Sequence, residues 1–246
     1  MTSDLVAVLA AGSEVHLWLR RLALDAEPSA NERASLDADE RERAGHFLRD
    51  IDRRRFIRRH LHLREVLARY LHVASDGVPL ETKLHRPPRL LGDHEANDLR
   101  FSLSSSGDRS AVALAWRRPI GVDIERIDPE AANDTVARTV FSLREREAMT
   151  ATPDGEWQTL FFRIWARKEA FVKAQGTGLA RDLMSFDVVQ PDRRRRGGGE
   201  ALVTDRQAEA GEPPWLVRDV HGPPDFALAC CAKGDDWSIV CHEDEA

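Results

Sequence analysis

One helical pattern constrains the fold of this chain more than any other feature of its 246 residues. In the stretch DIDRRRFIRRHLHLREVLARYLHV, residues 50–73, apolar side chains recur at three- and four-residue spacing, as on the buried face of an α-helix. The apolar set is Phe56, Ile57, Leu61, Leu63, Val66, Leu67 and Tyr70. Arginines fill the opposite face, so the pattern predicts a long amphipathic helix with one basic side.

The elements around this helix predict a mixture of helices and strands in the first half of the chain. We expect a strand at 15–19 and a helix from Asp37 to Phe47 that begins with a capping box. A loop is expected over 84–98, where two prolines interrupt the chain. Two strands should flank the polar turn Ser104–Asp108.

The same order returns in the second half. A strand at 119–127 precedes helices at 130–150 and at 163–175. Further strands are expected at 185–189, 202–204, 215–220, 226–232 and 237–241. This order predicts an α+β fold with two similar, pseudo-symmetric lobes, residues 1–119 and 120–246, each an antiparallel sheet packed with a long helix.

Composition limits the class of protein. The chain is 42% hydrophobic and has a net charge of -6, so no global attraction to nucleic acid or membrane follows. Cys230, Cys231 and Cys241 are odd in number and lack the spacing of a zinc site, which indicates free thiols in a reducing compartment. Because the sequence has neither a secretory signal nor an apolar run that could span a bilayer, we expect a soluble cytoplasmic protein.

Asp123 and Glu125 lie two residues apart in the predicted strand 119–127. Alternate residues of a strand point to the same face, so the two carboxylates project together, about 6–7 Å apart along the chain. Such a pair suits Mg²⁺, which takes one or two carboxylates together with phosphate oxygens and waters. A solvated strand edge explains the same two residues.

Glu169 lies on the apolar side of the helix predicted within RIWARKEAFVKAQGTGL, residues 163–179. Trp165 and Lys173 share its face because they are four residues away on either side. A buried carboxylate is costly unless it meets a cation. A helix-surface ion pair with Lys173 would supply one, but it leaves Lys168 and the following Gly-Thr-Gly unexplained. Three carboxylates with two lysines describe a metal–phosphate site.

The basic helix has three interpretations. Residues 41–70 contain ten arginines and four acidic residues, an excess that indicates an anionic ligand or partner. The helix could be a solvated surface, a nucleic-acid patch or a phosphate pocket, and the net charge and single tyrosine argue against nucleic acid. The turn SLSSSGD, residues 102–108, adds hydroxyls and backbone N–H groups that suit a phosphate, although a serine-rich turn is also common on surfaces.

Two of these motifs together resemble a known family. GVDIERI at 121–127 and WARKEAFVKAQGTGL at 165–179 resemble the signature motifs of 4′-phosphopantetheinyl transferases, of the larger single-chain type named for the surfactin-synthesis enzyme. Weaker similarities extend over residues 15 to 190. They comprise a first helix in LDADERERAGHF, the long basic helix, a turn in HRP and a strand end in FSLSSSGD.

This resemblance implies an enzyme that transfers the phosphopantetheine arm of coenzyme A to a serine hydroxyl of an acyl or peptidyl carrier protein, releasing adenosine 3′,5′-bisphosphate. By motif match, Asp123, Glu125 and Glu169 would bind Mg²⁺. Glu169 would also be the base for the incoming serine, directly or through water. Lys168 and Lys173 would hold pyrophosphate oxygens, with Lys173 and Glu169 as the catalytic residues.

The same match places coenzyme A contacts in the first lobe. Arg43, Arg55 and Arg86 correspond to basic positions around the adenosine 3′-phosphate. Ser104 and Ser105 would lie beside the nucleotide.

Two departures from the family pattern leave alternatives open. Ser105 stands where the family has histidine, and His85 with Arg86 replaces glycine-lysine. Both changes would weaken coenzyme A binding, and neither affects the metal ligands. An active transferase, monomeric because both lobes lie in one chain, is our expectation. A non-catalytic coenzyme A-binding homologue and a nucleic-acid-binding protein are the alternatives.

Overall fold

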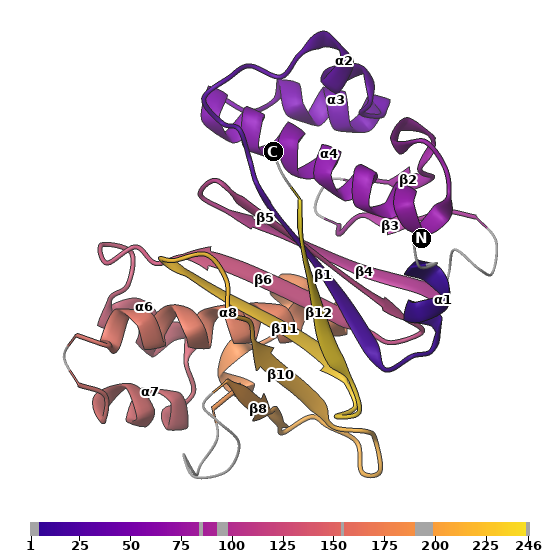
Figure 1. The fold of residues 1–246 in the computed structure, drawn as a ribbon. Coiled ribbons are helices and arrows are strands. Elements are labelled where there is room, and N and C mark those ends of the chain that lie inside the picture. Colours follow the sequence, from indigo (N-terminus) through magenta and orange to yellow (C-terminus); the bar gives the residue numbers. More distant parts are fainter. Residues whose placement is uncertain (1–4, 84–85, 93–97, 154, 190–198, 245–246) are drawn as a thin grey trace. The chain divides into compact units, whose positions relative to one another are not determined.

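The computed structural model describes residues 5–83, 86–92, 98–153, 155–189 and 199–244. The chain divides into two compact units, one made of Met1–Arg117 with Ser238–Ala246 and the other of Arg118–Trp237. Each unit contains both helices and a four-stranded sheet, which confirms the predicted α+β class (Figure 1).

The first unit is organised around the predicted long helix. Its helices are α1 (Leu5–Ala10), α2 (Ala30–Ala34), α3 (Ala38–Gly45), α4 (Asp50–Leu71) and the 3₁₀ helix η1 (Ser75–Gly77). Its strands are β1 (Glu14–Arg21), β2 (Leu80–Glu81), β3 (Arg89–Leu90), β4 (Leu99–Ser106), β5 (Arg109–Trp116) and β12 (Ser238–Asp244). Helix α4 buries Leu63, Val66 and Leu67 completely, so the apolar face read from the sequence faces the core.

The sheet of this unit has the order β12-β1-β5-β4. Strands β1, β5 and β4 are antiparallel, but β12 pairs with β1 in parallel, with Ser238 opposite Glu14. The prediction of a fully antiparallel sheet is therefore wrong for this unit. The expected second lobe, residues 120–246, also differs from the structure, because its last strand, β12, belongs to the first unit. Apolar patterning identifies a strand but does not name its partner, because pairing is decided by tertiary contacts.

Two local predictions in the first unit have different outcomes. Helix α3 begins with the expected capping box, in which Asp37 and Glu40 exchange side chain–backbone hydrogen bonds. The expected loop over 84–98 contains the short strand β3, whose Leu90 pairs with Leu80. Two residues of ladder are too few to produce a periodic signal in the sequence.

The second unit has one antiparallel sheet of order β6-β11-β10-β8 packed with a long helix. Its helices are α6 (Asp134–Val140), α7 (Leu143–Thr150), α8 (Trp157–Gln175) and the 3₁₀ helices η2 (Gly178–Ala180) and η3 (Leu183–Ser185). Its strands are β6 (Ile120–Arg126), β7 (Phe186–Asp187), β8 (Glu200–Leu202), β9 (Thr204–Asp205), β10 (Trp215–Asp219) and β11 (Phe226–Lys233). Phe141, Ile164 and Phe171 are completely buried in its core.

The helix expected over 130–150 is two helices. Helix α6 ends before Phe141, which is extended, and α7 begins after Ser142 with a capping box to Glu145. A serine that bonds the backbone at an N-cap favours a new helix start over continuation. Helix α8 ends as expected at Gly176, whose φ of 69° is in the left-handed region.

Three further predictions concern less regular features. The stretch PDRRRRGGGE, residues 191–200, has the composition of an arginine-rich loop, and it lies mostly outside the described residues. Cys230 and Cys231 are buried on β11 and Cys241 is exposed on β12, all as free thiols. Among the described helices, none combines the length and the hydropathy that crossing a membrane requires.

Candidate active site

Strand β6 lies in direct contact with helix α8 because residue 121 is a glycine. A Cβ at Gly121 would lie 1.9 Å from the carbonyl O of Ala170 and 2.5 Å from the backbone N of Ala174, far inside van der Waals contact. Residues 121, 123 and 125 lie on the same face of the strand, because successive residues of a strand point to opposite faces. Asp123 and Glu125 therefore lie on the face of β6 that packs against α8.

Asp123, Glu169 and Lys173 form an ionisable cluster where β6 meets α8. Asp123 is 2% exposed, and its Oδ1 accepts a hydrogen bond from Lys173 Nζ at 2.6 Å. Burial raises the pKa of Glu169, the negative charge of Asp123 raises it further, and the positive charge of Lys173 lowers it. Lys173 thus contacts a carboxylate of the strand, which an isolated Glu169–Lys173 pair on a helix surface would not do.

The structure tests whether this cluster suits a metal ion. Glu169 and Asp123 are close enough to repel, and a cation beside both would relieve that repulsion. Across the described parts of the chain, however, no group of three or more His, Cys, Asp or Glu side chains is arranged so that it could hold a metal ion. The three-carboxylate set is therefore not assembled, and half-buried Glu125 lies further along the same strand face. Two carboxylates are sufficient for Mg²⁺, which completes its shell with waters and phosphate oxygens.

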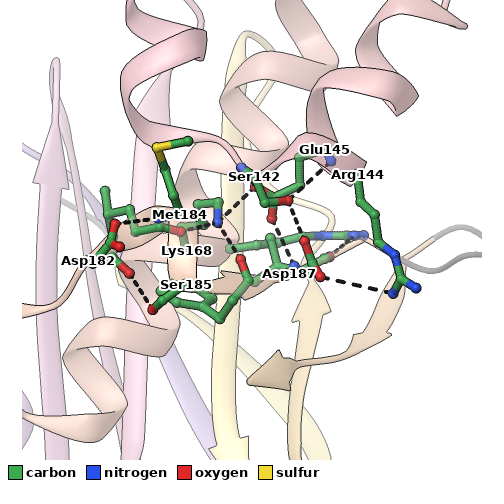
Figure 2. A network of polar contacts seen from close by, with 12 residues as sticks. Ser142, Arg144, Glu145, Lys168, Asp182, Met184, Ser185 and Asp187 are labelled. Atoms are coloured by element: carbon green, nitrogen blue, oxygen red, sulfur yellow. Dashed lines mark hydrogen bonds and ion pairs between the residues drawn. The ribbon is translucent and has the colours of Figure 1, made fainter. Parts of the chain in front are cut away.

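Lys168 lies inside the second unit, and its predicted contact with pyrophosphate is contradicted. The residue is 1% exposed, and its Nζ pairs with Glu145 Oε2 at 2.8 Å (Figure 2). The same Nζ donates to the carbonyl oxygens of Leu183 and Phe186 at 2.7 and 2.9 Å. These three contacts use all three ammonium donors. Successive residues of a helix point about 100° apart, so residue 168 cannot share the face that carries Glu169.

Glu145, which the sequence reasoning missed, joins this lysine to helix α7. It is completely buried and accepts hydrogen bonds from the backbone N–H groups of Ser142 and Val188, both at 2.9 Å. Burial raises the pKa of Glu145 and lowers the pKa of Lys168, and the opposite charge of each partner acts against that shift. This network holds α8 at the residue before Glu169 and so helps to orient that carboxylate. The capping-box spacing of Ser142 and Glu145 was its one signal in the sequence.

In the first unit, helices α3 and α4 bring Arg43 and Arg55 together with a third arginine, Arg59. The guanidinium carbons of Arg43 and Arg59 lie 5.2 and 5.3 Å from the centre of the Phe56 ring. Arg55 Nε donates to the carbonyl oxygen of Gly107 at 2.8 Å, at the turn between β4 and β5. The sequence reasoning missed Arg59 because nothing local separates it from the other arginines of the helix.

The two serines at the end of β4 have different surroundings. Ser104 is 8% exposed. Ser105 is half-buried, and its Oγ lies 3.4 Å from Arg59 Nη1, which donates to it. Arg86 is exposed, and His85 lies outside the described residues. The grouping of Arg86 with Arg43 and Arg55 as contacts of a phosphate stays a prediction.

Comparison with known proteins identifies the family. A family model described as the 4′-phosphopantetheinyl transferase superfamily matches residues 119–231, which include Asp123, Glu169 and Lys173. The 4′-phosphopantetheinyl transferase HetI of Nostoc sp. is 37% identical over 171 residues, covering 68% of this chain and 71% of the relative. This chain belongs to the 4′-phosphopantetheinyl transferase superfamily, which confirms the resemblance of its motifs, and it is an enzyme of that class.

Two further relatives extend the comparison. The 4′-phosphopantetheinyl transferase Sfp of Bacillus subtilis is 25% identical over 213 residues, covering 85% of this chain and 89% of the relative. Among solved structures, a holo-(acyl-carrier-protein) synthase from Bacillus anthracis in complex with CoA has a TM-score of 0.38 and 21% identity. That similarity covers 48% of this chain and 96% of the other.

Proposed function

We propose that this enzyme transfers the 4′-phosphopantetheine group from coenzyme A to a serine hydroxyl of an apo acyl or peptidyl carrier protein, with Mg²⁺. Adenosine 3′,5′-bisphosphate is the proposed second product. Membership of the transferase family supports the reaction class. The cluster of Asp123, Glu169 and Lys173 is the observation that carries the assignment of residues.

Glu169 is the proposed base. Its pKa is raised by burial and by Asp123, so its carboxylate is more basic than that of an exposed glutamate. It would accept the serine proton, directly or through water. The serine oxygen then forms a bond to the phosphorus of the phosphopantetheine group. The bond from that phosphorus to the bridging pyrophosphate oxygen breaks, and its electron pair leaves with adenosine 3′,5′-bisphosphate.

Lys173 is the proposed pyrophosphate ligand. Its side chain is 30% exposed, in contrast to Lys168, so it can leave or share its contact with Asp123 when an anion arrives. Asp123 and Glu169 would hold Mg²⁺, with Glu125 next along the same face. The ion would offset the negative charge of the pyrophosphate and of the leaving group.

In the first unit, Arg43, Arg55 and Arg86 are the proposed contacts of the adenosine 3′-phosphate, with Ser104 and Ser105 beside the nucleotide. Arg43 and Arg55 are supported by their placement with a third cation. We further propose that the protein acts as a cytoplasmic monomer. Each unit combines one four-stranded sheet with one long helix, α4 or α8, which supports the proposed pseudo-symmetry.

Mass spectrometry of carrier proteins tests the reaction. The enzyme is incubated with coenzyme A, Mg²⁺ and a panel of apo acyl and peptidyl carriers. We expect at least one carrier to gain the mass of phosphopantetheine, and Glu169→Gln to abolish the gain. Glu147→Gln, at an exposed position of α7, is the matched control. If no carrier is modified while a known transferase modifies them, the proposed reaction is wrong for that panel.

The remaining alternatives have distinct outcomes in the same experiments. A non-catalytic homologue, suggested by Ser105, would bind coenzyme A without modifying any carrier. Nucleic-acid binding predicts salt-sensitive retention of DNA or RNA. It is disfavoured because most arginines of α4 form ion pairs with acidic residues of their own unit.

A further inference from the structure

Arg59 differs from the other six arginines of helix α4. Each of the others pairs with a carboxylate. The pairs are Arg53 with Glu27 and Asp50, Arg54 with Glu27, Arg55 with Asp52, Arg58 with Glu32, Arg64 with Asp37 and Glu40, and Arg69 with Asp244. Within the described chain, no carboxylate oxygen lies within 4.0 Å of the Arg59 guanidinium.

The surroundings of Arg59 are unfavourable for a cation. Its Nε is buried and makes no hydrogen bond within the described residues. Within the same residues, the one hydrogen bond of the guanidinium is donated by Nη1 to Ser105 Oγ at 3.4 Å. Burial and the positive charges of Arg43 and Arg55 lower the pKa of Arg59 to about 10. A half-buried cation that faces two others without an acid is stabilised by an anion that the protein itself does not supply.

The number of charges indicates the kind of anion. Asp52 neutralises Arg55, whereas Arg43, like Arg59, pairs with no carboxylate among the described residues. Two positive charges therefore remain uncompensated. A phosphomonoester carries about -1.5 to -2 at neutral pH, and guanidinium groups bind its oxygens in a bidentate fashion. Each phosphate of a pyrophosphate diester carries about one negative charge, so a phosphomonoester matches the site better.

We propose that Arg59 binds the 3′-phosphate of coenzyme A together with Arg43 and Arg55, and that it makes the enzyme prefer coenzyme A to dephospho-coenzyme A. This inference rests on the proposed function, because it takes coenzyme A as the substrate. Arg59 joins Arg43, Arg55 and Arg86, the arginines assigned by resemblance to the family, although it belongs to no family motif. The contact with Ser105 also has a role, because it orients the guanidinium through Nη1.

Calorimetric binding of the two nucleotides tests the proposal. The full-length enzyme, Arg59→Gln and Arg58→Gln are titrated with coenzyme A and with dephospho-coenzyme A, which lacks only the 3′-phosphate. We expect Arg59→Gln to weaken coenzyme A binding about tenfold or more and to leave dephospho-coenzyme A binding unchanged. Arg58→Gln, which removes an ion-paired neighbour, should preserve the wild-type preference. Arg59→Lys should retain part of the preference, because it keeps the charge without the bidentate geometry.

Two results would overturn the proposal. If Arg59→Gln weakens the binding of both nucleotides equally, Arg59 does not recognise the 3′-phosphate. If it weakens the binding of neither, Arg59 does not contact the nucleotide. Thermal unfolding without ligand separates binding from folding. Arg59→Gln should not lower the Tm, since it relieves repulsion, and a large decrease would assign Arg59 a structural role instead. A wild type that binds coenzyme A with this preference but modifies no carrier would refute the transfer reaction and leave the Arg59 assignment standing.

Discussion

Replacing Gly121 with alanine should disrupt the contact that brings the proposed catalytic residues together. The added Cβ would lie 1.9 Å from the carbonyl O of Ala170 and 2.5 Å from the backbone N of Ala174, whereas non-bonded heavy atoms in contact stay about 3.5 Å apart. Strand β6 and helix α8 would have to separate by roughly 1.5 Å to restore normal contact. Both obstacles are backbone atoms, so no change of side-chain rotamer can relieve the clash.

The cost of this separation can be bounded. Overpacking in a core typically costs about 1–3 kcal/mol, and a backbone clash belongs at or above the upper end of that range. The hydrogen bond from Lys173 Nζ to Asp123 Oδ1, 2.6 Å long, spans the same contact and would lengthen beyond hydrogen-bonding range. A misplacement of about 1 Å in a catalytic group can reduce the rate about 100-fold. We therefore expect a loss of about 3 kcal/mol in unfolding free energy and about a 100-fold loss in transfer rate.

Urea denaturation and the rate of carrier modification measure these two losses. Gly155→Ala is the matched control, because it lies in the same unit and an added Cβ there would meet no atom within 4 Å. The rate is compared per folded molecule, so that a loss of stability is not counted as a loss of catalysis. If Gly121→Ala and Gly155→Ala have the same stability and the same rate, the argument that residue 121 sets the approach of β6 to α8 is refuted.

Three further predictions concern the buried Lys168, the buried His62 and the metal ion. Lys168→Met leaves the carboxylate of Glu145 buried without its cation and should lower the free energy of unfolding in urea by about 3–5 kcal/mol. The double variant with Glu145→Gln should recover part of this loss. If the losses of the two single variants simply add in the double variant, the two residues do not act as an ion pair. Burial lowers the pKa of His62 from 6.5 to about 3, so the unfolded chain binds a proton at this residue more readily than the folded protein does. The free energy of unfolding should therefore fall by on the order of 4 kcal/mol as the pH decreases from 6.5 toward 3. His62→Gln, which can keep a hydrogen bond to Ser110, should show a shallower decrease, and an unchanged slope would contradict the assignment. Treatment with EDTA should abolish transfer and added Mg²⁺ should restore it, with Asp123→Asn requiring more Mg²⁺; full turnover after chelation would exclude the metal.

Local signals predicted the elements with strong periodicity. Helices α4 and α8, the capping box at Asp37 and the glycine stop at Gly176 follow from interactions within a few residues, and such interactions are visible in any single sequence. The grouping of Asp123 with Glu169 was also predictable, because each residue was anomalous in its own element. The sequence pointed to one site of three carboxylates and two lysines, of which the structure brings together Asp123, Glu169 and Lys173.

The sequence by itself determined the α+β class, the long helices and the family of this enzyme, because these depend on periodicity and on motifs that are contiguous in the chain. Tertiary structure alone decided that β12 pairs in parallel with β1. It also decided which charges are compensated. Lys168 and Lys173 are five residues apart on one helix, yet one is enclosed by Glu145 and carbonyl groups while the other reaches Asp123. Arg59 and Arg58 are adjacent, yet only Arg58 meets an acid among the described residues. Whether a charge is paired depends on elements distant in sequence, because the electrostatic energy of a side chain is set by what surrounds it in space.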